Sequence, residues 1–123
     1  WELDLASDHI WWSDETYRIF EIDSKDFDMS YEAFLNLIHP DDRDMVKKAF
    51  NVSIANHEPY DIIHRLYFDD GRIKYVNERC RTYYDTEGNP IHSIGTVQDI
   101  TDRYQKDEEI ERYHSILMSL VES

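Results

Sequence analysis

The sequence lacks the residues that build several common functional sites. It holds one cysteine, Cys80, so no disulfide can form within the chain, and neither this cysteine nor the six histidines fall at zinc-binding spacings. No apolar run approaches the roughly 20 residues that a membrane-spanning helix needs. The chain also has no glycine-rich nucleotide-binding loop and no kinase phospho-acceptor motif. We therefore expect no metal site, no membrane span and no catalytic output module in these residues.

Basic residues are scarce relative to acidic ones. Lysine and arginine total 13 against 27 aspartate and glutamate, which gives a formal charge of -14. Such a chain repels nucleic acid and anionic membrane surfaces, so we expect no nucleic-acid partner and no direct membrane contact. The expected location is the cytoplasm. Because strand-like and helical patterns run up to the two ends, we expect a piece of a longer protein, whose parent can still be membrane-anchored.

The first half of the chain predicts a hairpin followed by three helices. Alternating apolar residues and a turn signal predict the hairpin within residues 1–12. Ser13 and Ser30 are the predicted N-caps of the first two helices, and Pro40 ends the second. We expect Asp41-Asp42 in the first turn of the third helix, where carboxylates favour the positive end of the helix dipole.

Three longer strands follow a helix-breaking segment at residues 56–59. We expect them at residues 60–68, 73–84 and 91–101, joined by two glycine-containing turns. The connections are too short for a crossover, so the pairing should be antiparallel. With the hairpin, this predicts an α+β fold: a five-stranded antiparallel sheet with helices packed on one face, followed by a C-terminal helix.

Several short motifs occur in the order found in a known family. They are Trp12-Ser13-Asp14-Glu15-Thr16-Tyr17-Arg18-Ile19, His39-Pro40-Asp41-Asp42-Arg43, Asp69-Asp70-Gly71 and Gly95-Thr96-Val97-Gln98-Asp99-Ile100-Thr101. In this order they resemble a PAS sensor domain of a bacterial or archaeal signal-transduction protein, with the PAC-type Asp-Ile-Thr motif ending its last strand. The resemblance covers nearly the whole chain. It implies a sensor domain at residues 1–101 and a signalling or linker helix at residues 102–123.

The resemblance also implies a function. In that family, such domains lie upstream of histidine kinase or nucleotide-cyclase modules, pair as dimers and pass signals through the helix after the last strand. We therefore expect a non-enzymatic sensory or regulatory domain of a histidine kinase or diguanylate cyclase type of protein, including two-component systems. The alternative is a ligand-free dimerisation or protein-interaction module. A small α+β enzyme of the ketosteroid-isomerase type would instead need a catalytic carboxylate, for which Glu78 is the residue to test.

A small-ligand pocket is expected between the sheet and its helices. The strand after Pro59 places its more apolar face toward the helices, and the resemblance implies that the next strand also lines the cavity. The candidate pocket residues are Tyr17, Phe34, Ile38, Ile62, His64, Leu66, Val76, Glu78, Cys80 and Val97. The polar pair of His64 and Glu78 in an apolar pocket is typical of a ligand site. Its alternative is that the two side chains satisfy each other in a ligand-free core.

Other chemistry finds little support in the same residues. His64, Glu78 and Cys80 lack the strained nucleophile turn and oxyanion donor of a catalytic centre. The flavin-binding light sensors of the resembled family carry their cysteine on a helix, whereas Cys80 falls on a strand, which argues against flavin-cysteine photochemistry. Haem-binding members of the resembled family carry their ligand histidine on the helix before the long strands. The histidine nearest to that position here, His57, lies in a helix-breaking segment, so haem is poorly supported. The residues 39–42 are better explained by helix capping than by metal binding.

The end of the chain is expected to relay a signal. Asp99, Ile100 and Thr101 form the predicted junction between the last strand and the final helix. Four apolar residues of this helix recur at steps of three, four and three, which is a heptad seam of about two heptads: Ile110, Tyr113, Leu117 and Leu120. A coiled coil between two protomers and a helix packed on its own sheet both stay open. Apolar residues on the outer sheet face favour a homodimer as well.

Overall fold

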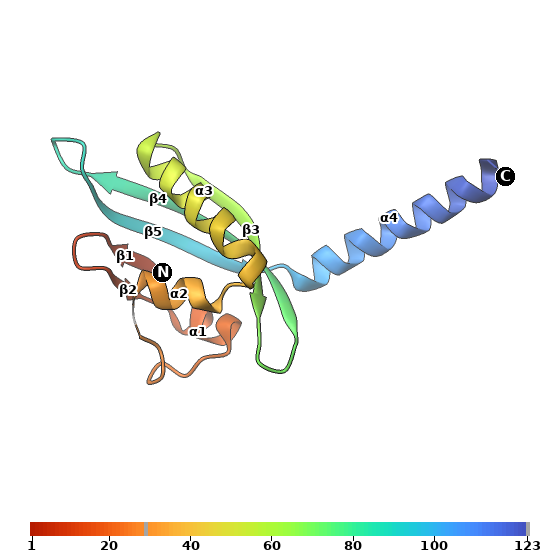
Figure 1. The fold of residues 1–123 in the computed structure, drawn as a ribbon, viewed down its shortest axis with the longest axis horizontal. Helices are drawn as coiled ribbons and strands as arrows, with labels where there is room; N and C mark the ends of the chain where they lie inside the picture. The colour runs from red at the N-terminus through yellow and green to blue at the C-terminus, as the bar shows by residue number, and fades with distance from the viewer. Residues whose placement is uncertain (29, 123) are drawn as a thin grey trace.

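A five-stranded antiparallel sheet forms the centre of the computed structural model, which describes residues 1–28 and 30–122 (Figure 1). Its strands lie in the order β2-β1-β5-β4-β3. They are β1 (Glu2–Asp4), β2 (His9–Trp11), β3 (Tyr60–Tyr67), β4 (Ile73–Tyr84) and β5 (Pro90–Asp99). The predicted α+β fold class, including the antiparallel pairing and the C-terminal helix, is confirmed.

The first two helices each begin directly after a serine that caps them. The helical segments are α1 (Asp14–Phe20), α2 (Tyr31–Leu37), the 3₁₀ helix η1 (Pro40–Asp42), α3 (Arg43–Ala55) and α4 (Thr101–Glu122). The Ser13 hydroxyl accepts a hydrogen bond from the Thr16 amide at 3.2 Å, and the Ser30 hydroxyl accepts one from the Ala33 amide at 3.1 Å. Both predicted N-caps are thus confirmed.

The structure corrects two predicted boundaries. Asp41 and Asp42 lie in η1 rather than in the first turn of the third helix, because residues 40–42 form a tight 3₁₀ turn and α3 starts at Arg43. The Asp42 carboxylate accepts hydrogen bonds from the Arg65 backbone and guanidinium, at 2.7 to 3.0 Å, and so ties this turn to β3. The last strand ends at Asp99, since Thr101 already belongs to α4.

The core lies between the sheet and the three helices α1, α2 and α3. Leu3, Ile10 and Phe50 belong to one buried cluster, and Ile19 and Leu66 belong to a second. The last helix, α4, extends away from this body (Figure 1). Among the described residues, no helix is both long and apolar enough to cross a membrane.

Candidate ligand cavity and exit-helix junction

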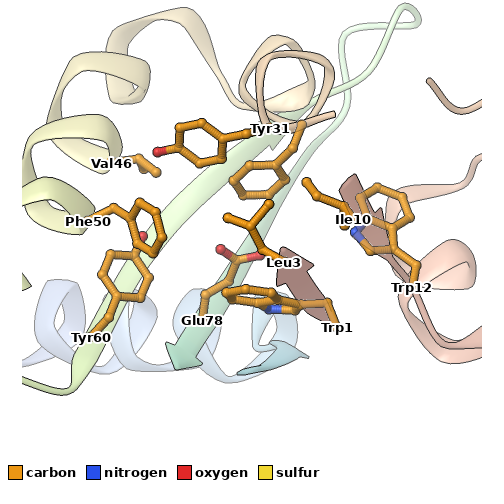
Figure 2. Close-up of a pocket in the computed structure, with 10 residues that line it drawn as sticks. Trp1, Leu3, Ile10, Trp12, Tyr31, Val46, Phe50, Tyr60 and Glu78 are labelled. Carbon is orange, nitrogen blue, oxygen red and sulfur yellow. The ribbon is translucent and has the colours of Figure 1, made fainter. Parts of the chain in front are cut away.

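A small, mostly apolar cavity of about 30 Å³ lies between the sheet and helices α2 and α3 (Figure 2). Its lining comes from β1, β2, β3 and β4, the two helices and residues that flank the first hairpin. The lining residues are Trp1, Leu3, Ile10, Trp12, Tyr31, Phe34, Val46, Phe50, Tyr60 and Glu78. A cavity of this size has room for about two water-sized groups.

Aromatic side chains pack around the cavity in several orientations. The ring centroids of Tyr31 and Phe50 lie 5.4 Å apart, and those of Phe50 and Tyr60 lie 5.8 Å apart with their planes at 90°. The Trp1 ring is seated over Gly95, where an added Cβ would lie 2.5 Å from the indole. The absence of a side chain at position 95 therefore allows the indole to line the cavity.

Glu78 brings a carboxylate into this apolar site. The residue is 3% exposed, and its Oε2 lies 3.2 Å from Nε2 of His64, which is 1% exposed. This distance suits a hydrogen bond, but the approach is poorly aligned, and His64 Nε2 makes no hydrogen bond of good geometry within the described residues. The expected proximity of the two side chains is confirmed. The two side chains therefore satisfy each other's hydrogen-bonding groups only in part.

Two further polar atoms at the cavity are buried without a hydrogen-bond partner in the described part of the chain. They are the Tyr31 hydroxyl and the indole Nε1 of Trp1. Buried polar groups in native proteins are normally hydrogen-bonded, so each unpartnered group calls for a water molecule or a ligand. Three of the lining residues therefore carry buried polar groups, a carboxylate, a hydroxyl and an N–H group, although the cavity wall itself is almost entirely apolar.

The environment of the cavity opposes additional negative charge. Burial, with a smaller contribution from the Glu78 charge, raises the pKa of Tyr31 to about 12. The same two causes raise the pKa of the Cys80 thiol to about 12, and they also raise the pKa of Tyr60. These groups are neutral at physiological pH.

The structure brings only some of the sequence-based pocket residues to the cavity wall. Phe34 and Glu78 line it, whereas Ile38, Leu66 and Val76 are fully buried in the packed core beside it. The other candidates lie in or beside the two buried clusters of the core, or contact the cavity residue Trp12. Ile62 packs against the cluster of Leu3 and Phe50, Val97 against that of Leu66, Cys80 is buried in the former cluster, and the Tyr17 ring contacts Trp12.

Most lining residues were not among those candidates. Trp1, Leu3 and Ile10 come from the N-terminal hairpin, which folds across the cavity next to β5. Val46, Phe50 and Tyr60 carried a signal in the sequence, because they fall on the apolar stripe of α3 and on the inward face of β3. That the hairpin residues line the cavity could not be predicted from the sequence, because it depends on the long-range pairing of β1 with β5.

The residues present do not fit a haem or a flavin-cysteine adduct. The His57 ring stacks on Tyr84, with centroids 3.8 Å apart, and it does not line the cavity. Cys80 is buried on β4 rather than carried by a helix. Small-molecule sites usually have volumes of about 300 to 1,000 Å³, about tenfold or more above this cavity.

The exit helix is joined to β4 through backbone and side-chain contacts. The Tyr75 amide donates a hydrogen bond to Thr101 Oγ1 at 3.0 Å, and the Ile100 amide donates one to the Tyr75 carbonyl at 2.9 Å. The Thr101 hydroxyl in turn donates to Asp99 Oδ1 at 2.6 Å. The predicted junction residues therefore contact β4 through Tyr75, a contact that the sequence did not predict.

Beyond its first turns, α4 does not pack on its own sheet. Tyr104 stacks on Tyr75 of β4, but Ile110, Tyr113 and Leu117 are 66%, 62% and 59% exposed. Leu120 is likewise exposed to solvent. Of the two arrangements expected for this helix, packing on its own sheet is therefore wrong for the seam residues.

Comparisons with known proteins place this fold among sensory domains. The model of the PAS fold family matches residues 9–97. The sensor protein FixL of Bradyrhizobium diazoefficiens is 28% identical over 105 residues, which cover 85% of this chain and 21% of that protein. An uncharacterized protein of Sinorhizobium fredii, y4lL, is 35% identical over 66 residues, or 54% of this chain and 8% of that protein. The chain thus spans at most about a fifth of these relatives.

Solved structures agree with the family match. A sensory box histidine kinase/response regulator from Burkholderia thailandensis superposes with a TM-score of 0.81 at 20% identity, covering 97% of this chain and 88% of that one. The N-terminal domain of a diguanylate cyclase with a PAS/PAC sensor from Marinobacter aquaeolei gives 0.75 at 15% identity, covering 85% and 95%. At these identities the similarity shows the fold alone.

The fold and the family match define the chain as a sensory or regulatory signalling domain. It belongs to the PAS fold family, whose model covers most of its length.

Proposed function

We propose that this domain senses a small molecule in the cavity at Glu78 and passes the change to α4. In this proposal residues 1–101 are the sensor and residues 102–123 the signalling helix. One observation carries it: the residues that line an aromatic cavity carry a buried carboxylate and two polar atoms for which the described residues supply no hydrogen-bond partner. A few convergent polar groups within apolar walls are the usual composition of a small-ligand site.

The route from the cavity to the helix runs along β4. Glu78 pairs with Val97 of β5, and Val76 pairs with Asp99 at the strand end. Tyr75 follows next toward the start of β4 and holds Thr101 through its backbone. A ligand that moves β4 relative to β5 would therefore re-aim α4. It can do so only to the extent that it binds one arrangement more tightly than the other.

The exposed seam of α4 favours a homodimer. Most of the stability of helices in proteins comes from packing an apolar face, so a helix that leaves the domain gains stability when another helix covers its apolar residues. A second copy presents the same seam, and two such helices can form a short coiled coil. We accordingly propose that α4 pairs with its counterpart and continues toward an output domain in the same polypeptide.

We further propose that the parent is a cytoplasmic or membrane-anchored signalling protein of the histidine kinase or diguanylate cyclase type. Two observations support this: the sensor protein FixL as a relative, and solved structures from a histidine kinase and a diguanylate cyclase with the same fold. In this proposal any catalysis belongs to the output domain, and residues 1–123 supply sensing and dimerisation.

A second candidate is a ligand-free dimerisation module. The cavity volume of about 30 Å³ favours it, because the aromatic side chains leave little space between them. In that case the dimer contacts of α4 would remain, and the polar groups at the cavity would be satisfied by water.

Native mass spectrometry of the purified chain separates the two candidates. Sensing predicts a dimer that carries a small molecule, released when the chain unfolds, and a rise in Tm when that molecule is added back. A dimer without adduct in every preparation, together with a Tm that no compound of a metabolite panel changes, would contradict sensing and leave the dimerisation module.

A further inference from the structure

We infer that the cavity is built for a small protonated amine, of the size of ammonium or methylammonium, whose charge pairs with the Glu78 carboxylate. This inference rests on the proposed sensing function and names the ligand class for it.

The Glu78 carboxylate lacks a full counter-charge. It is 3% exposed, and the described residues place no lysine or arginine in an ion pair with it. The imidazole of His64 lies beside it, with Nε2 at 3.2 Å from Oε2 but without a well-aligned hydrogen bond. A buried carboxylate is costly unless it is paired and hydrogen-bonded. A cation in the adjacent cavity would supply both the charge and the N–H donors.

The walls of the cavity are those that bind organic cations. Six aromatic side chains line it, namely Trp1, Trp12, Tyr31, Phe34, Phe50 and Tyr60. The negative face of an aromatic ring attracts an ammonium group, most strongly where water is excluded, and cages of such rings are used to recognise alkylammonium ligands. Figure 2 shows the Glu78 carboxylate pointing into the space between these rings.

Anions are disfavoured by the same site. The pKa values of Tyr31 and Cys80 are raised to about 12, with burial the larger cause and the Glu78 charge the next. A carboxylate or phosphate ligand would meet the same two penalties. The net charge of -14 adds a long-range attraction for cations.

The size and the remaining polar groups fit a ligand of one or two heavy atoms. The volume of about 30 Å³ holds about two water-sized groups. The Tyr31 hydroxyl, which has no partner within the described residues, can accept a hydrogen bond from the ammonium. Trp1 Nε1 can only donate, so it is available to a water molecule that shares the cavity.

The test is a titration of the ¹⁵N-labelled chain with methylammonium chloride, followed through the indole N–H signals of its tryptophans. Methanol is the neutral probe of equal size, sodium acetate the anionic one, and sodium chloride controls ionic strength. We expect a saturable shift of the Trp1 and Trp12 signals with methylammonium alone. Trp11 is 47% exposed on β2 and should not respond.

Glu78→Gln tests the charge without changing the shape of the side chain. We expect methylammonium binding to weaken roughly tenfold or more, since a desolvated charge pair is lost. Glu87→Gln, on the exposed β4–β5 turn, is the matched control and should bind as the unchanged chain does. If Glu78→Gln does not fold, the selectivity of the unchanged chain for methylammonium over methanol and acetate decides the question.

The outcomes separate this inference from the sensing function. Three results would overturn the inference that the ligand is an amine. They are equal responses to methylammonium and methanol, no saturable response to ammonium or methylammonium, and unchanged affinity in a folded Glu78→Gln chain. If native mass spectrometry then finds a neutral or anionic molecule bound, sensing stands and the ligand class is wrong. If methylammonium binds but distances between spin labels on paired α4 helices stay unchanged, the amine stands and the relay is wrong.

Discussion

The Tyr104 ring lies flat against the Tyr75 ring, with centroids 3.9 Å apart and planes 12° apart. Tyr75 belongs to β4 and Tyr104 to the first turns of α4, so this stacking fixes the direction in which the helix leaves the sheet. Together with the hydrogen bonds of Thr101, it makes the start of α4 part of the folded domain.

Removing this stacking should loosen the exit helix. We expect Tyr104→Ala to lower the free energy of unfolding by about 1 kcal/mol, the usual contribution of an aromatic pair. Hydrogen exchange of residues 101–106 should become faster while the central strands keep their protection. Gln105→Ala, at an exposed neighbouring position, is the control. Equal exchange in the two variants would show that the ring contact does not hold α4.

Gly95 should be required for the cavity wall. In Gly95→Ala the new Cβ would lie 2.5 Å from both the Trp1 ring and the Arg79 carbonyl oxygen, so the indole must move. We expect a loss of about 1–3 kcal/mol in stability, as for other overpacked sites. The tryptophan fluorescence should shift to longer wavelength as Trp1 gains exposure. An unchanged spectrum with unchanged stability would contradict the observed seating of the ring.

The proposed dimer depends on the seam of α4. Paired substitutions Ile110→Asp and Leu117→Asp place charges in the predicted coiled-coil contact, and sedimentation equilibrium should then show monomers. The residues are 66% and 59% exposed in a single chain, so the fold itself should survive, which circular dichroism can check. Ser115→Asp, at an exposed position on the face of α4 opposite the seam, should leave the dimer intact. A double variant that remains dimeric would place the interface elsewhere.

Cys80 should be chemically inert in the folded domain. Its pKa is raised to about 12 by burial and by the Glu78 charge, so almost no reactive thiolate exists at pH 8. Iodoacetamide should therefore label the native chain far more slowly than the chain unfolded in urea, as measured by intact mass. Labelling at equal rates would mean that the thiol is exposed through frequent opening of the sheet.

Because of Glu21, the free energy of unfolding should fall as the pH drops into the acidic range. Hydrogen bonds from Arg72 and Lys74 lower its pKa from 4.5 to about 2. A lowered carboxyl pKa stabilises the folded state above about 4.5, and this contribution disappears as the pH falls toward 2. Because the side chain is 34% exposed, we expect solvent screening to leave only about 1 kcal/mol.

Denaturant unfolding of Glu21→Gln checks this window. The variant should be less stable than the unchanged chain at pH 7, and the difference should vanish near pH 2. Glu32→Gln, for which no such ion pair exists among the described residues, should show no difference at either pH. A deficit that stays constant from pH 7 to pH 2 would assign the effect to packing rather than charge.

Local patterns in the sequence predicted most of the elements. Ser13 and Ser30 cap helices because their hydroxyls reach amides only three residues away, and the turn residues fix short antiparallel connections in the same local way. The alternation along β3 likewise placed His64 on the inward face. The boundary at residues 40–43 was wrong, because a 3₁₀ turn, which is frequent at the start of an α-helix, precedes α3.

The candidate site was predicted less completely. Glu78 and Phe34 were expected at the cavity, but Trp1, Leu3 and Ile10 reach it only because β1 pairs with β5, some 90 residues later in the chain. No local pattern encodes which strand a short hairpin will join. The seating of Trp1 over Gly95 depends on the same pairing.

By itself, the sequence determined the class of fold, the start of each capped helix and the acidic character of the domain, since these depend on residues close together in the chain or on composition alone. Only the tertiary structure decided which side chains enclose the cavity, that Glu78 lies there without a full counter-charge, and that Tyr75 holds α4. Those relationships join distant segments, and their free energy exists only once the sheet has formed.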